Sequence, residues 1–375
     1  MNIGILTLPL HVNYGGILQA YALQTVLRQM GHEVSLIEER QKPARLPWRH
    51  APVQYGKRIV KNFLGRRCPV FYEQKVNRER AVVRQHTERF IDTYIRRRLI
   101  DDFREIAASD YEEIIVGSDQ IWRPAYFPQI EHAYLDFAEN WDVRRVAYAA
   151  SFGTDVWEYT PEQTRRCGDL LKKFDAVSVR ESSGVALCKE RFGVRAGHVL
   201  DPTMLLSAAD YKRLIENRNM PEREGILFSY FLDETPEKKA WAGRMAKEKR
   251  LVPCYMGLNV ENFALPLDKR IQPPVEQWIS GLYDAEFVVT DSFHACVFSL
   301  IFNKPFVVIG NRGRGMPRFA SLLGKLGLID RLWMGVPSCS YDFDEIDWRK
   351  INDQIGYERE VSKRFLECQG LCEKE

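Results

Sequence analysis

The sequence lacks any long apolar run and any recognisable leader segment. Its longest apolar runs, such as Val297 to Phe302, fall well short of the ~20 residues that a membrane-spanning helix needs. The N-terminal residues, Asn2 to Thr7, lack the charged start and long apolar stretch of a signal peptide. They have the pattern of a first β-strand instead. These absences argue against a membrane-spanning helix, and we expect a cytoplasmic protein.

Cysteine and histidine lack the spacing of metal ligands. The eight cysteines are scattered, with no C-x-x-C pair and no Cys/His cluster of zinc spacing. Cys368 and Cys372 could share one helix face, but reduced thiols are the rule in a cytoplasmic chain. We therefore expect no bound metal and no bound cofactor.

Acidic residues are absent from residues 41–70, although the net charge of the whole chain is only +3. Trp48, Tyr55, Phe63 and Leu64 are interleaved with the cations of this segment. Such a segment can contact anionic lipid at the inner face of a membrane or hold a polyanionic substrate, or it can be a solvated loop and helix face. No nucleic-acid-binding motif accompanies the charge, so nucleic acid is not an expected partner. The eight cations are Lys42, Arg45, Arg49, Lys57, Arg58, Lys61, Arg66 and Arg67.

The chain of 375 residues exceeds the size of one ordinary hydrophobic core, so two domains are expected. Apolar runs of strand length alternate with helical patterns in two successive series. In the first series, strands are predicted at 3–8, 33–37, 112–117, 145–150 and 176–179, with helical patterns at 17–30 and 76–108. In the second, strands are predicted at 225–230, 251–256, 287–289 and 306–309, and a helical pattern follows at 343–366.

This alternation predicts an α/β fold of two Rossmann-like domains that face each other across a cleft. We place the first domain at residues 1–203 and the second at residues 204–345. A C-terminal helical segment follows at residues 346–375. The chain is expected to leave the first domain at Asp201-Pro202-Thr203.

The most informative stretch is Thr290-Asp291-Ser292-Phe293-His294-Ala295, which lies between an apolar strand pattern and an apolar helix pattern. His294 is therefore predicted in the first turn of a helix, at the carboxyl end of a strand. Ligands of open α/β sheets bind at such places, and a helix start attracts anions. A histidine there can transfer protons beside a bound anion. The alternative is a helix-capping or structural histidine.

Four segments resemble the motifs of the polysaccharide pyruvyl transferase family. They lie in order at 13–23, 116–122, 178–181 and 290–294, with the sequences NYGGILQAYAL, VGSDQIW, SVRE and TDSFH. The resemblance implies a GT-B-like fold, with the acceptor on the first domain and the donor on the second. It also implies transfer of pyruvate from phosphoenolpyruvate to hydroxyls of a cell-surface glycan or its lipid-linked precursor. A pyruvate ketal would form, phosphate would be released, and His294 would be the catalytic acid and base.

Phosphoenolpyruvate carries a phosphate and a carboxylate, so its site needs cations. Arg180 follows a strand and suits this role, unless it only forms a surface pair with Glu181. Arg312 and Arg318 belong to a Gly-rich stretch after the last strand and could clamp the phosphate, or this stretch could be a basic surface loop. Family members often have an arginine two residues before the histidine, where this chain has Ser292. Either one of the three arginines compensates at the donor site, or the donor differs.

The acceptor site is predicted on the first domain. Asn13, Gly15 and Gly16 form the first strand-to-helix loop, where small residues let backbone N–H groups approach a ligand. They could equally serve close helix–sheet packing. Asp119 and Gln120 could bind sugar hydroxyls, or Ser118 and Asp119 could merely cap a helix.

Two other functions fit parts of the sequence. A sugar-nucleotide-dependent glycosyltransferase could have the same GT-B fold, because fold does not fix function. It would bind a nucleotide diphosphate in the second domain. A glycan-binding or membrane-associated scaffold could use residues 41–70 and would not need His294.

Overall fold

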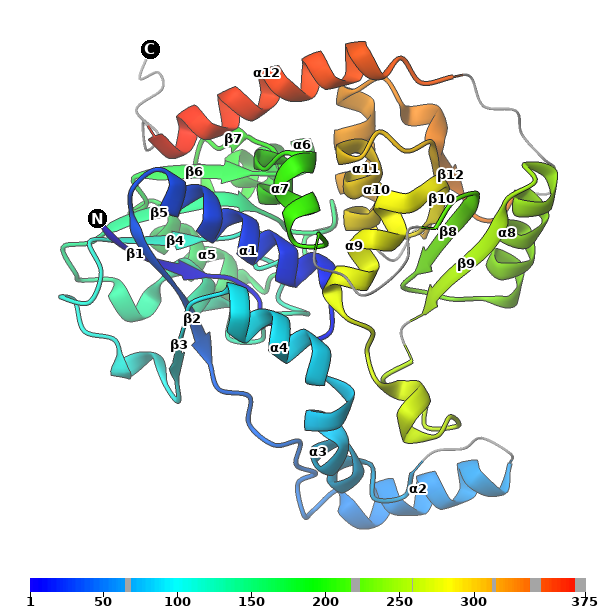
Figure 1. Ribbon diagram of the computed structural model, residues 1–375. Helices are drawn as coiled ribbons and strands as arrows, with labels where there is room; N and C mark the ends of the chain where they lie inside the picture. Colours follow the sequence, from blue (N-terminus) through cyan, green and yellow to red (C-terminus); the bar gives the residue numbers. More distant parts are fainter. Residues whose placement is uncertain (65–68, 217–222, 258, 312–314, 338–344, 368–375) are drawn as a thin grey trace.

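The chain forms two parallel β-sheets, each flanked by helices (Figure 1). The computed structural model describes residues 1–64, 69–216, 223–257, 259–311, 315–337 and 345–367. The predicted α/β fold with two Rossmann-like units is confirmed. Residues 65–68, 312–314 and 368–375 lie outside the described part, and with them lie Arg66, Arg67, Arg312, Cys368 and Cys372.

The first sheet has the strand order β3-β2-β1-β4-β5-β6-β7, and all neighbours are parallel. Because helices cover both faces, its central strands have continuous apolar runs rather than an alternating pattern, and all four residues of β4 are buried. The strands are β1 (Asn2–Leu6), β2 (Glu33–Glu39), β3 (Arg97–Ile100), β4 (Glu113–Val116), β5 (Arg144–Ala150), β6 (Ala176–Val179) and β7 (Gly197–His198).

The second sheet has the order β12-β11-β10-β8-β9, again parallel. Each sheet reverses its strand order once, between β1 and β4 in the first sheet and between β8 and β10 in the second. Ligands bind outside the carboxyl ends of strands at such switch points. The strands are β8 (Ile226–Phe231), β9 (Val252–Gly257), β10 (Ala285–Thr290), β11 (Phe306–Gly310) and β12 (Leu332–Met334).

Helices join the two halves at several places. Tyr14, the first residue of α1, stacks on Trp278 of α9 with ring centroids 5.5 Å apart, and its hydroxyl donates to the Pro273 carbonyl. The last helix, α12, crosses both halves in Figure 1. The helices are α1 (Tyr14–Gln29), α2 (Ala51–Phe63), α3 (Tyr72–Val83), α4 (Gln85–Tyr94), α5 (Pro161–Leu171), α6 (Ser182–Leu187), α7 (Ala208–Arg213), α8 (Pro236–Glu248), α9 (Val275–Asp284), α10 (Phe293–Ile301), α11 (Met316–Lys325) and α12 (Trp348–Glu367).

The prediction of a helix throughout residues 76–108 is wrong in its second half. Helix α3 ends at Val83 and helix α4 ends at Tyr94. Residues 97–100 then form β3 at the edge of the first sheet. Arg97 on this strand forms ion pairs with Glu38 and Asp92. Pairing with β2 and these ion pairs outweigh the local helical pattern, as tertiary context commonly does. The domain limits at residues 203 and 345 stay predictions.

Candidate functional site

The two switch points face each other, and His294 lies where they meet. Ser292 caps α10, since its hydroxyl accepts from the Ala295 N–H at 3.4 Å. His294 is thereby fixed in the first turn of α10 with a 6% exposed side chain. Its imidazole packs against Gly15 of α1 so closely that a methyl group on Gly15 would overlap the ring. Gly15 therefore allows the two domains to approach at this point.

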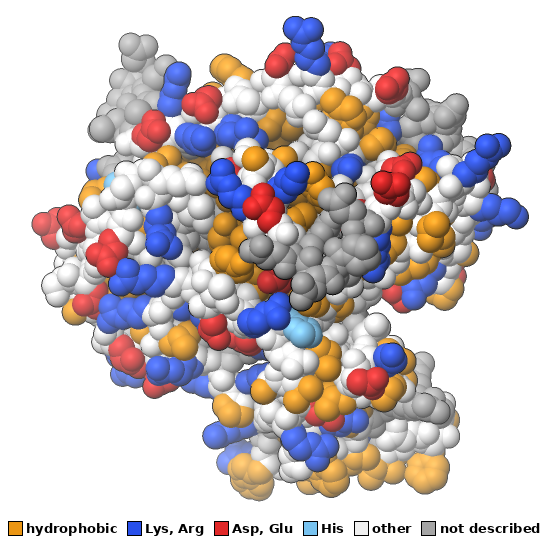
Figure 2. Space-filling model, viewed as in Figure 1, with side chains coloured by type: hydrophobic (Ala, Val, Ile, Leu, Met, Phe, Trp, Pro, Cys, Tyr) orange, Lys and Arg blue, Asp and Glu red, His pale blue; other side chains and the backbone are white. Residues whose placement is uncertain are grey.

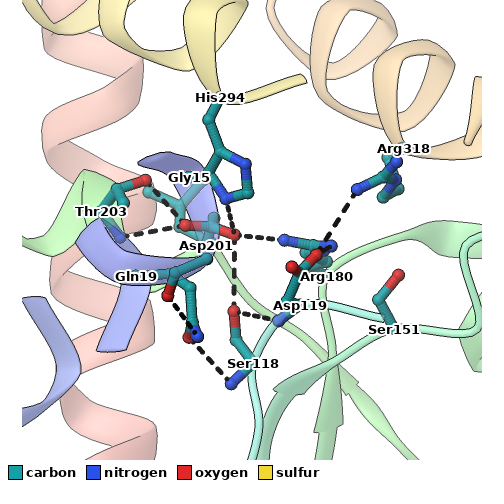
Figure 3. Close-up of polar contacts among 12 residues, drawn as sticks. Gly15, Gln19, Ser118, Asp119, Ser151, Arg180, Asp201, Thr203, His294 and Arg318 are labelled. Carbon is teal, nitrogen blue, oxygen red and sulfur yellow. Dashed lines mark hydrogen bonds and ion pairs between the residues drawn. The ribbon is translucent and has the colours of Figure 1, made fainter. Parts of the chain in front are cut away.

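A chain of buried charges leads from His294 into the first domain (Figure 3). His294 Nε2 lies 3.7 Å from Asp201 Oδ2, a distance for an ion pair rather than a hydrogen bond. Arg180 bridges two carboxylates, at 2.6 Å from Asp201 Oδ2 and 2.8 Å from Asp119 Oδ1. Arg318 of α11 completes the chain with Nη1 at 3.8 Å from Asp119 Oδ1. All five side chains are less than one-tenth exposed.

Asp201 is held firmly in this chain. Its Oδ1 accepts from the backbone N–H and the hydroxyl of Thr203, at 3.0 and 2.7 Å. Ser118 Oγ lies 3.5 Å from its Oδ2. Burial alone would raise the pKa of the Asp201 carboxyl, but the neighbouring His294 ring and the Arg180 guanidinium hold this pKa well below its ordinary value. Asp201 is therefore an ionised carboxylate with a fixed orientation toward His294.

The alternative that Arg180 only forms a surface pair with Glu181 is wrong. Its side chain is fully buried, and the neighbouring Glu181 is farther away, at 3.9 Å, than the two aspartates. Burial opposes the charged guanidinium, but Asp119 and Asp201 raise the pKa of Arg180. Glu181 instead accepts from Ser151 Oγ at 2.9 Å, and burial raises the pKa of its carboxyl.

Arg318 differs from Arg180 in having fewer partners. Among the described residues, no acceptor lies within hydrogen-bond distance of its buried Nε, and its guanidinium folds over Gly315. Burial and repulsion by Arg180 lower the pKa of Arg318 to about 10. A buried guanidinium with unused donors is a suitable anchor for an anion.

A pocket of about 520 Å³ opens between the domains. His294, Asp201, Arg180, Asp119 and Arg318 do not line it. The pocket lies on the Arg318 side of the cluster, because it includes Gly315, against which Arg318 packs. Its lining comes from the loop after β5, the start of α6, the start of α11 and the end of β12: Gly153, Thr154, Asp155, Ser182, Ser183, Gly315, Met316, Pro317, Ala320, Ser321 and Met334.

The serine in place of the usual arginine caps α10 and is itself buried. Arg180 and Arg318 lie over the ring of the next residue, Phe293, with guanidinium carbons 5.0 and 5.2 Å from its centroid. Both arginines thus reach the neighbourhood that an arginine at position 292 would occupy. Arg312, the third predicted donor residue, lies outside the described residues.

The predicted acceptor residues surround the first switch point. Asn13 caps α1, because its side chain accepts from the Gly15 N–H at 3.1 Å. A methyl group on Gly16 would have Asp119 Oδ2 at 3.7 Å, an ordinary contact. Gln120 lies against Gly153 and accepts from Arg123 at 3.4 Å. Residues 118–122 form a turn that starts no helix, so the alternative of helix capping by Ser118 and Asp119 is wrong.

Asp201, Thr203 and Ser118 were not among the site residues predicted from the sequence. Asp201 had a usable signal, because it follows the last strand of its sheet and so lies at the same edge as the other strand ends. Within the described residues, no group of three His, Cys, Asp or Glu side chains could hold a metal ion. None of the helices described is both long and apolar enough to cross a bilayer.

Comparisons with known proteins agree with this arrangement. The family model described as polysaccharide pyruvyl transferase matches residues 13–313. Among solved structures, Arabidopsis thaliana UGT89C1 complexed with UDP-L-rhamnose is similar with a TM-score of 0.50 and 9% identity, over 98% of each chain. A Listeria monocytogenes protein assigned as a UDP-N-acetylglucosamine 2-epimerase is similar with a TM-score of 0.50 and 12% identity, over 100% of this chain and 98% of that chain. At these identities the likeness concerns the GT-B-like fold alone. The search of curated proteins found no match.

Proposed function

Because the chain belongs to the polysaccharide pyruvyl transferase family, we propose that it transfers a pyruvyl group from phosphoenolpyruvate to two hydroxyls of a cell-surface polysaccharide or its lipid-linked precursor. A proton adds to the methylene carbon of the donor, which becomes the methyl group. The two hydroxyl oxygens bond to C2, and the bond from C2 to the phosphate oxygen breaks. The proton of the second hydroxyl leaves with the phosphate, so the products are a cyclic pyruvate ketal and hydrogen phosphate. No cofactor or metal is part of the proposal.

The observation that carries this proposal is the pairing of His294 with Asp201 at the meeting of the two switch points. In the proposed mechanism, His294 takes a proton from an acceptor hydroxyl and delivers a proton to the methylene carbon. Asp201 holds the imidazole in one orientation and stabilises its protonated form, as a carboxylate beside a catalytic histidine does. Proton transfer by one positioned group contributes about 10²–10⁴-fold to a rate.

The donor is proposed to bind on the second domain, in the pocket beside Arg318. Arg318 does not line the pocket, but its buried Nε donor lies beside it without a partner among the described residues, and the backbone N–H groups at the start of α11 favour an anion. Arg180 acts through the electrostatic field, since Asp119 and Asp201 already occupy both of its Nη atoms. Ser292 and Arg312 remain proposed donor-site residues.

The acceptor is proposed to bind on the first domain, beside the loop after β1 and the turn after β4. Asn13 is exposed there, whereas Asp119 and Gln120 lie deeper in the cleft. Gly15 and Gly16 let the α1 backbone come close to a sugar. We also propose that the protein works in the cytoplasm and contacts the inner face of the membrane through residues 41–70, where a lipid-linked acceptor would lie.

The direct test of the mechanism is a His294→Gln variant. Phosphate release from phosphoenolpyruvate would be measured with lipid-linked glycan precursors as acceptors, and the ketal detected by mass spectrometry. We expect a loss of about 10²–10⁴-fold, the range for a general acid and base. His132→Gln is the matched control, because His132 pairs with Asp136 away from the cleft. Wild-type rates in His294→Gln would remove His294 from the mechanism.

A further inference from the structure

Helix α2 projects from the body of the protein at the lower edge of Figure 1. None of its residues is buried. It is attached along one side only, where Arg58 forms a bidentate ion pair with Glu73 at 2.8 and 2.7 Å. Tyr55, on the same side, packs edge-on against Phe71 with ring centroids 5.2 Å apart. These contacts determine which face of α2 points away from the protein.

The opposite face of α2 is apolar and exposed. At 100° per residue, Val53, Ile59, Val60, Phe63 and Leu64 fall on one continuous arc that excludes the attached side. Phe63 is 88% exposed and Leu64 75% exposed. Figure 2 shows hydrophobic side chains gathered along the lower edge, where α2 lies in Figure 1. An exposed apolar patch of this kind usually marks a contact surface.

Positive charge borders the apolar arc. Lys57 and Lys61 lie beside it on the helix, and both are exposed. Trp48, in the turn that precedes α2, is 78% exposed and lies under the Arg49 guanidinium. Residues 41–70 contain no Asp or Glu. An apolar face with a cationic border and an exposed tryptophan suits the boundary between headgroups and acyl chains of an anionic bilayer.

We propose that α2 is a peripheral membrane anchor that inserts the face formed by Val53, Ile59, Val60, Phe63 and Leu64 into an anionic lipid surface. Lys57 and Lys61 then contact the headgroups. This inference deepens the proposed membrane contact and is independent of the pyruvyl-transfer chemistry.

The anchor also has a fixed position relative to the cleft. Helix α3, which carries α2, forms the buried ion pair Glu79–Arg270 with the second domain at 2.6 Å. The Val83 carbonyl accepts from the Gln272 N–H at 2.8 Å. Helix α3 belongs to the first half of the chain and contacts the second domain. When α2 binds a bilayer, it therefore holds the cleft in one orientation to that bilayer.

The test is sedimentation of the full chain, without substrates, with vesicles of phosphatidylglycerol and phosphatidylcholine or of phosphatidylcholine alone. We expect binding to the anionic vesicles that weakens with added salt. The double variant Val60→Asp/Phe63→Asp should bind at least roughly tenfold more weakly, because two inserted apolar side chains become charged. Lys57→Gln/Lys61→Gln should lose the preference for anionic lipid.

The matched control is Val156→Asp/Tyr357→Asp, which places the same charges at exposed apolar residues outside α2; it should bind as the wild type does. Wild-type binding by Val60→Asp/Phe63→Asp, or no sedimentation with anionic vesicles, would overturn the proposal. So would a dimer in light scattering that this variant dissociates, because the face would then contact a second copy. Phosphate release with a water-soluble acceptor should be unchanged in the variant, so failure of the anchor is distinct from failure of the chemistry.

Discussion

His294 was the residue that the sequence pointed to most strongly, because a strand pattern, a capping serine and a helix pattern place it without knowledge of the rest of the chain. Its partner Asp201 is 93 positions away in the sequence and meets it only when the two domains close. The neutralising partners of Arg180 are likewise distant in sequence. Local pattern therefore located the individual side chains, whereas the ion-pair chain that connects them depends on tertiary structure.

Gly15 of α1 allows a steric prediction. Gly15→Ala places a methyl group inside the His294 imidazole, so the domains cannot close as they do here, and ketal formation should fall by about 10²-fold or more. Gly243→Ala in α8 is the control, because a methyl group on Gly243 would meet no atom within 4 Å among the described residues. The test is to measure the steady-state rate of ketal formation in both variants, with circular dichroism to check that both are folded. Equal rates in the two variants would contradict the packing of His294 on Gly15.

Asp201 allows a prediction of stability against pH. The pKa of Asp201 is lowered in the folded protein. Its contribution to the free energy of unfolding is therefore fully present above the ordinary Asp pKa of about 3.9 and is lost as pH falls below that value. Asp201→Asn should lower the free energy of unfolding by about 3–5 kcal/mol, because Arg180 loses a buried partner. Urea unfolding should give a difference at pH 5 that is no smaller than the difference at pH 7. Asp155→Asn, at an exposed position, should change little.

A difference for Asp201→Asn that already shrinks between pH 7 and pH 5 would show that the carboxyl titrates in that range. The account of Asp201 as a firmly ionised partner of His294 would then be wrong.

At the scale of elements, the positions of most strands were predictable. β6 has the predicted limits, and β4, β5, β8, β9 and β11 agree within one residue at each end, whereas β1, β2 and β10 differ by two residues at one end. The edge strand β3 was missed, since only Ile100 of its four residues is buried and its two arginines form no apolar strand pattern. The attached side of α2 could not be predicted either, because Glu73 and Phe71 belong to the following segment.

The link between α3 and the second domain gives a prediction at this scale. Glu79→Gln leaves the buried Arg270 guanidinium without its carboxylate and should lower the free energy of unfolding by about 3–5 kcal/mol. Glu33→Gln removes the partner of Arg96 in an ion pair whose side chains are more than half exposed, and it should cost less than about 1 kcal/mol. Urea unfolding of both variants measures the contrast. Similar losses of unfolding free energy in the two variants would mean that α3 is not an integral part of the domain interface.

At the scale of the whole molecule, two parallel sheets present their switch points to one another, and the buried charges lie between them. The fold was predictable because two β-α series repeat in the sequence, whereas the approach of α1 to α10 was not. In the arrangement described here, His294 is almost fully buried. The proposed reaction therefore requires the domains to separate before substrates reach the imidazole, as in proteins whose domains close around ligands.

The most direct measurement is the thermal shift of the protein with phosphoenolpyruvate compared with a panel of nucleotide sugars. A ligand that binds the native state must raise Tm by mass action. We predict a shift with phosphoenolpyruvate that is lost in Arg318→Lys, because lysine cannot present the planar guanidinium, and that is retained in Arg123→Lys. A shift with a nucleotide sugar and none with phosphoenolpyruvate would contradict pyruvyl transfer and favour a glycosyltransferase of the same fold.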